Sequence, residues 1–132
     1  MRERLVVFSL LAVCTAFSLQ SAHGLETSKI DAKLGRSGVW IEGNYVVDFF
    51  RTDVPVTLQG VRLAAGQVDS FASFTGKDEN AEMMGEVCAL TSEVTAVVEK
   101  LRAGGIGITG IHNHFVGESP RLIFIHFMAH GP

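Results

Sequence analysis

Three histidines near the end of the chain are the residues best suited to chemistry. His112 and His114 are separated by one residue, and His126 follows twelve residues after His114. Both segments have the composition of β-strands, and residues i and i+2 of a strand point to the same face. A hairpin would bring His126 to the same place. Because imidazole is the commonest protein metal ligand and titrates near neutral pH, the spacing predicts a metal site or an acid–base site.

The connection between the two segments decides whether the histidines meet. With a five-residue loop at 116–120, Gly110 faces His126 and His114 faces Leu122, so even-numbered residues face one another. All three imidazoles then share one face, and Gly110 leaves room for a ring or an ion. A slip of two residues preserves this arrangement, whereas a slip of one residue moves His126 to the opposite face.

The chemistry of three neutral imidazoles is that of a catalytic zinc site with an open fourth position. Such a metal lowers the pKa of bound water toward about 7 and supplies hydroxide for hydrolysis. Histidine-rich ligation fits Zn, Ni, Cu or Fe better than Mg or Ca, and we expect zinc. Glu86 is the candidate general base or fourth ligand, because a parallel crossover would place its strand beside 106–115. Glu118 is a second candidate, whereas Asn113 points the other way and is expected to fix structure.

Other interpretations of these residues remain open. The histidines could be structural, and His126, which lies among apolar neighbours, could be a core residue with one satisfied nitrogen. The letters His-Asn-His do not indicate the nuclease class of that name, whose residues are spread over a longer unit. The run from His112 to Glu118 matches the first ligand motif of cupins, but the second motif is missing. His130, near the end of the sequence, is expected to be solvated.

The first 24 residues predict a secretory signal peptide. Two arginines open the chain, an apolar run covers 5–17, and small residues precede Leu25, where we expect cleavage. The run is too short to span a membrane as a helix. A lipoprotein anchor at Cys14 is disfavoured because Val13 is too bulky for that cleavage. We therefore expect an exported protein, periplasmic or extracellular.

The remaining chain, 25–132, has the length of one domain. It carries 9 basic and 13 acidic side chains, a net charge of −4, which argues against a nucleic-acid interface. No later stretch is long enough to span a membrane. Cys88 is the one cysteine left, so no internal disulfide can form, and we expect a buried thiol.

Hydrophobic periodicity and turn residues predict the elements. Helices are expected at 26–34, ended by Gly35, and at 91–103, capped by Thr91 or Ser92. Strands are expected at 39–41, 45–50, 54–58, 61–63, 71–74, 81–90, 106–115 and 122–128, with turns at 43–44, 59–60 and 75–80. The fold class is α+β: a mixed, mostly antiparallel sheet with a helix on one face, ending in a β-α-β-β hairpin.

Three segments resemble the LppY/LpqO family of exported bacterial proteins: 43–61, 84–94 and, most specifically, 105–127. The shared pattern is an Arg-[Ser/Thr]-Asp segment, a Gly-Glu strand, a His-Asn-His strand, a Pro-Arg turn and a His-Phe strand. The resemblance implies export and a single domain, and it names no reaction. Phe71 stands where a Trp is typical. Family members usually continue beyond the His-Phe strand, and many carry a second copy, so we expect the sequence to be either a C-terminally truncated fragment or a minimal version of the domain.

Arg51, in the Arg-Thr-Asp motif, has two interpretations. It could form an ion pair or support a turn at a strand end. It could also bind substrate by gripping a carboxylate or phosphate. We favour the structural role and retain Arg51 as a substrate-binding candidate.

The leading hypothesis is an exported domain that binds a divalent transition metal, and further a metal-dependent hydrolase. The alternative is a non-catalytic module that binds a small molecule or a cell-envelope component, with structural histidines. A third is a structural domain whose histidines are inert.

Overall fold

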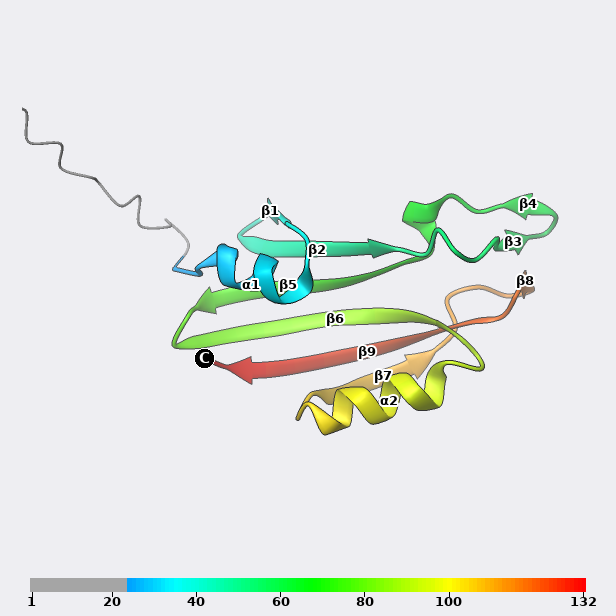
Figure 1. The fold of residues 1–132 in the computed structure, drawn as a ribbon. Coiled ribbons are helices and arrows are strands. Elements are labelled where there is room, and N and C mark those ends of the chain that lie inside the picture. Colours follow the sequence, from blue (N-terminus) through cyan, green and yellow to red (C-terminus); the bar gives the residue numbers. More distant parts are fainter. Residues whose placement is uncertain (1–23) are drawn as a thin grey trace, which may run out of the picture.

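The computed structural model describes residues 24–132, and the predicted signal peptide lies outside them except for Gly24. A six-stranded sheet runs through this part of the chain, and every neighbouring pair of strands is antiparallel (Figure 1). Its strands, in spatial order, are β1 (Val39–Ile41), β2 (Asn44–Phe50), β5 (Asp69–Lys77), β6 (Asn80–Leu90), β9 (Leu122–Gly131) and β7 (Gly107–His112). The predicted α+β class is confirmed.

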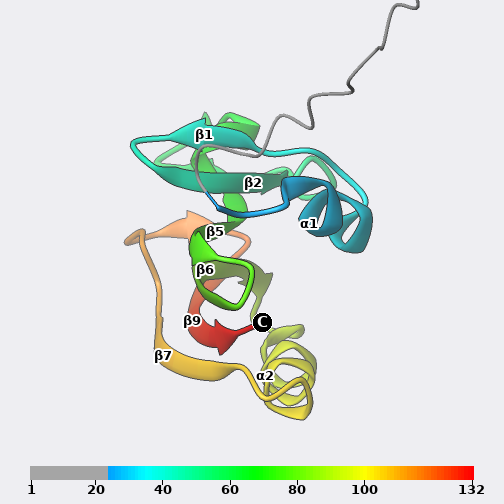
Figure 2. The same ribbon diagram turned by 90° about the vertical axis from the view of Figure 1, so that its left-hand side faces the viewer.

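Two helices lie on the same side of this sheet (Figure 2). They are α1 (Thr27–Leu34) and α2 (Val94–Ala103). Helix α1 ends as predicted at Gly35, which has a φ of 71° and donates its N–H to the carbonyl of Asp31. The Tyr45 hydroxyl on β2 donates to Asp31 Oδ1 at 2.6 Å and so ties this helix to the sheet. Neither helix of residues 24–132 is long and apolar enough to cross a membrane.

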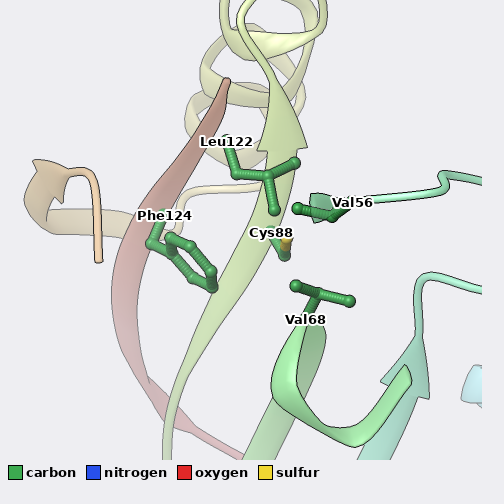
Figure 3. Close-up of a cluster of buried hydrophobic side chains, with 5 residues drawn as sticks. All are labelled: Val56, Val68, Cys88, Leu122 and Phe124. Carbon is green, nitrogen blue, oxygen red and sulfur yellow. The ribbon is translucent and has the colours of Figure 1, made fainter. Parts of the chain in front are cut away.

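A small second sheet covers one end of the other face. It consists of β4 (Val61–Arg62), β3 (Thr57–Leu58) and β8 (Glu118–Ser119), with the 3-10 helix η1 (Ala65–Gln67) nearby, and lies at the end away from the C-terminus (Figure 1). Under this end lies a cluster of buried side chains, in which Leu122 and Phe124 of β9 and Cys88 of β6 meet Val56 and Val68 (Figure 3). Burial of these apolar groups fixes the strands that carry the histidines.

Strands β6 and β9 are interior strands of the large sheet, and their ten cross-strand pairs run from Ala81–Gly131 to Leu90–Leu122. Both are covered on two sides at the end near the small sheet, where successive residues such as Cys88 and Ala89 are buried. The near-continuous apolar sequence of β9 is typical of a strand with both faces covered. The predicted burial of Cys88 is confirmed, since it is 1% exposed.

The structure corrects several predicted boundaries. The first hairpin turns at Glu42 and Gly43 (φ 48° and 83°), one residue earlier than expected, in a conformation that favours glycine at the second position. Strand β5 is longer than expected. Helix α2 begins after Glu93, so neither Thr91 nor Ser92 caps it. Glu93 instead accepts a hydrogen bond from Leu90 N.

The predicted contact between 81–90 and 106–115 is wrong. Strand β9 lies between β6 and β7, so the two strands joined by α2 run parallel but are not neighbours. The apolar β9 takes the interior place that is covered on both faces, and the glycine-containing β7 becomes the edge strand. Residues 113–121 are also more than a simple loop, because β8 within them pairs with β3.

Candidate metal centre

The histidines come from the last two strands of the large sheet. His112 is the final residue of β7, His114 follows two residues later, and His126 lies in the middle of β9. Gly110 is opposite His126 and His112 is opposite Phe124, so the predicted register is confirmed here. His114 lies beyond the end of β7, so its predicted pairing with Leu122 is not formed.

A bulge in β7 brings His112 to the histidine face. Before it, Ile108 pairs with Phe127; after it, Gly110 pairs with His126, which leaves Thr109 as the extra residue. If the first register continued, His112 would face Ile123 and its side chain would lie on the opposite face from His126. Bulges occur often beside active sites because they redirect a side chain. The sequence reasoning missed this bulge, and Gly110 was its only local signal.

The three imidazoles form one compact group. One nitrogen from each ring can be chosen so that all three lie within 4.8 Å of one another. The His112 and His126 rings are stacked, with centroids 4.8 Å apart, and the His112 and His114 centroids are 5.1 Å apart. Ligands of a tetrahedral zinc ion lie roughly 3.3 Å apart, given Zn–N bonds of about 2.0–2.1 Å. The cluster can hold a metal if the rings close by roughly an ångström and a half.

His126 carries an unsatisfied nitrogen. Its Nε2 atom is buried and has no hydrogen-bond partner among residues 24–132, although the side chain as a whole is 33% exposed. The Glu86 Oε2 atom lies 3.4 Å away but is not in hydrogen-bonding geometry. A buried polar nitrogen without a partner costs about 1–3 kcal/mol, so this atom requires a ligand, a proton partner or a water.

Glu86 brings a carboxylate to the same place. It lies on β6 directly opposite His126, and its side chain is 11% exposed. Its Oε2 atom is 3.7 Å from His114 Nε2, in addition to the contact with His126. The sequence reasoning expected Glu86 near the histidines, but through a neighbouring β7. The carboxylate in fact reaches them across β9.

His114 is held by an aromatic ring. It stacks on Phe124, with centroids 3.5 Å apart and planes inclined by 6°. Burial lowers the pKa of His114, and the nearby His112 and His126 lower it further, while Glu86 acts in the opposite direction. The neutral imidazole that a metal requires is therefore favoured at neutral pH. Sequence reasoning had not assigned Phe124 this supporting role.

Two residues beside the histidines are held by other contacts. Asn113 donates its amide to the Phe115 carbonyl at 2.6 Å, as expected for a residue that fixes structure. Glu118 is not in the histidine group. It is 5% exposed, accepts a hydrogen bond from Leu122 N at 3.2 Å and lies 3.4 Å from Arg121 Nε.

Arg51 is engaged in ion pairs. Its guanidinium donates to both oxygens of Asp53, to both oxygens of Glu93 and to the Cys88 carbonyl, at distances of 2.7–3.3 Å. The hydrogen bond to Glu93 is the main cause of a raised Arg51 pKa. These contacts are those of the structural role that the sequence favoured. Substrate binding by Arg51 stays a prediction.

A family model described as Domain of Unknown Function (DUF1259) matches residues 28–132, which include all three histidines and Glu86. The chain belongs to this family. The DUF1259 description assigns no activity. No curated protein and no solved structure matches the chain.

Proposed function

We propose that this DUF1259 domain binds a divalent transition metal through His112, His114 and His126. The observation that carries the proposal is the meeting of three imidazole nitrogens within 4.8 Å. The Glu86 carboxylate, 3.4 Å from His126 Nε2, is suited to be a fourth ligand or a general base. Zinc is the ion we expect, because three imidazoles with one further position match its catalytic coordination.

The finer proposal is that the metal activates water for hydrolysis. A bound ion would lower the pKa of a water molecule toward about 7, and Glu86 would accept its proton. Access supports this role, because His112 and His114 are exposed while Glu86 is buried. Substrate could therefore approach from the histidine side, with the base held behind the rings.

The place of action and the partner are further parts of the proposal. The charged and apolar pattern of the first 24 residues and the resemblance to LppY/LpqO proteins support export. An exported site of this kind would meet a small molecule or a component of the cell envelope.

Elemental analysis tests metal binding directly. The purified mature protein is expected to hold about one equivalent of a transition metal, and His112→Ala and His126→Ala should each remove it, because each deletes a ligand. His130→Ala is the matched control: His130 lies on β9, four residues from His126 on the same face, and is exposed. Metal-free wild type after reconstitution with zinc, or equal metal content in His126→Ala, would sink the proposal.

Turnover is tested separately on esters, phosphates and amides. A metal-loaded domain that is a hydrolase should act on at least one class, and Glu86→Gln should lower that rate. Retained metal with no turnover on any of them contradicts the hydrolase and supports a binding role.

A further inference from the structure

Two methionines lie beside the histidine cluster on the same face of the sheet. Met84 and Met128 are cross-strand partners on β6 and β9. Met84 lies two residues before Glu86 on β6, and Met128 lies two residues after His126 on β9. Residues two apart in a strand point to the same face, with Cα atoms roughly 6.5–7 Å apart.

Both methionine residues are exposed. Met84 is 58% exposed and Met128 is 44% exposed, because the small sheet covers only the opposite end of this face. On the neighbouring β7, Gly107 lies opposite Met128 and Gly110 lies opposite His126. The β7 residues paired with Met128 and His126 therefore carry no side chain. With three rotatable bonds, a methionine can turn its sulfur toward such a neighbour.

The combination of ligands selects among metals. Thioether sulfur is a soft ligand that favours Cu(I), whereas imidazole accepts copper as well as zinc. Zinc prefers nitrogen, thiolate and carboxylate ligands and gains little from a thioether. A pair of exposed methionines next to three histidines is therefore a donor set for copper. Two exposed methionines elsewhere on a surface, without histidines beside them, would not indicate a copper site.

We propose that the site takes Cu(I), held by His126 together with the sulfur atoms of Met84 and Met128. The proposal rests on the proposed function, because it uses the same His126 imidazole, and it adds the identity of a second ion and two further ligands. No change of oxidation state is required for binding.

The test is an anaerobic titration of the mature protein with Cu(I) in competition with bicinchoninate, alongside a zinc titration. The double variant Met84→Leu/Met128→Leu retains volume and apolarity but loses both sulfur atoms. We expect its Cu(I) affinity to fall at least tenfold while its zinc affinity is unchanged. Met83→Leu is the matched control, because Met83 is the neighbour of Met84 on the opposite face of β6 and should leave both affinities unchanged. X-ray absorption of the Cu(I) form should show sulfur scattering in the wild type and not in the double variant.

The outcomes separate the two proposals. Equal Cu(I) affinity in the wild type and the double variant overturns the copper proposal, while zinc binding that is lost in His126→Ala leaves the metal site standing. A parallel fall in both affinities also overturns it, since the methionines would then support the fold and not select copper. If neither ion binds the wild type, both proposals fail.

Discussion

At the scale of single residues, the candidate site contains one buried carboxylate. Glu86 faces the Nε2 atoms of His114 and His126 from a position that is mostly closed to solvent. A charge in such a place is retained only where cations or hydrogen bonds compensate it. Among the described residues, its ion-pair partners are the two imidazoles, which carry a charge only when they are protonated. A metal ion bound by these rings would supply the missing positive charge.

Glu86→Gln removes this charge and keeps the size of the side chain. We expect zinc affinity to fall about 10–100-fold, the range seen when a residue that orients or supports metal ligands is changed. Competition titration with a chromophoric chelator measures it. Glu82→Gln is the control, because Glu82 is exposed on the same strand and face, four residues away. Equal losses in the two variants would show a general effect of surface charge and contradict a specific role for Glu86.

Most of the residues at the site could be predicted from the sequence. Because residues alternate between the two faces of a strand, the spacing of His112 and His114 predicts that they share a face. The same alternation, with the expected loop length, places a glycine opposite His126. The support of His114 by Phe124 could not be predicted, because His114 lies outside the strand and its position depends on a stacking contact. The unsatisfied nitrogen of His126 likewise becomes visible only in three dimensions.

At the scale of elements, Arg51 joins two parts of the fold. It follows the end of β2 and binds Glu93, which precedes α2, and the Cys88 carbonyl on β6. Arg51 lowers the pKa values of Glu93 and Asp53 through its hydrogen bonds. Their contribution to stability is therefore present above the unfolded pKa values, near 4, and is lost as the pH falls through the lower folded values.

Arg51→Leu should destabilise the fold without changing the metal site. We expect the free energy of unfolding at pH 7 to fall by about 1–3 kcal/mol, discounted for the exposure of the carboxylates. The difference from wild type should narrow in urea denaturation at pH 3. Zinc content per folded molecule should stay unchanged, and Arg62→Leu, an exposed arginine on β4, should have little effect on stability. Normal stability with a loss of substrate binding would instead favour the substrate-anchoring role.

The elements show where prediction from sequence stops. The helices and the hairpin of β1 and β2 follow from local periodicity and turn residues. The order of β6, β9 and β7 does not, because it is decided by which strand can be covered on both sides. The same holds for β8, whose two residues pair with β3 across about sixty positions of sequence. The bulge at Thr109 is also a product of pairing.

At the scale of the whole molecule, the site lies between a covered part and an open part of one face of the large sheet. On one side of it, the small sheet buries Cys88, Leu122 and Phe124, and burial raises the pKa of the Cys88 thiol to about 11. On the other side, the same face of the large sheet is open at Met84 and Met128. The candidate ligands come from β6, from the end of β7 and the residues after it, and from β9. They meet only when the core is formed, so binding of a metal there would be linked to folding.

This linkage gives the last prediction. Zinc at a hundred times its dissociation constant should stabilise the fold by about 2.7 kcal/mol, because it binds the folded state and has little affinity for the unfolded one. For a domain of this size that corresponds to a rise in Tm of about 10–20 °C, measured by calorimetry with and without zinc. His126→Ala should remove the rise, and His130→Ala should keep it, since His130 lies outside the cluster. An equal rise in His126→Ala would place the bound zinc elsewhere on the molecule, and no rise in the wild type would mean that the three rings do not close on an ion.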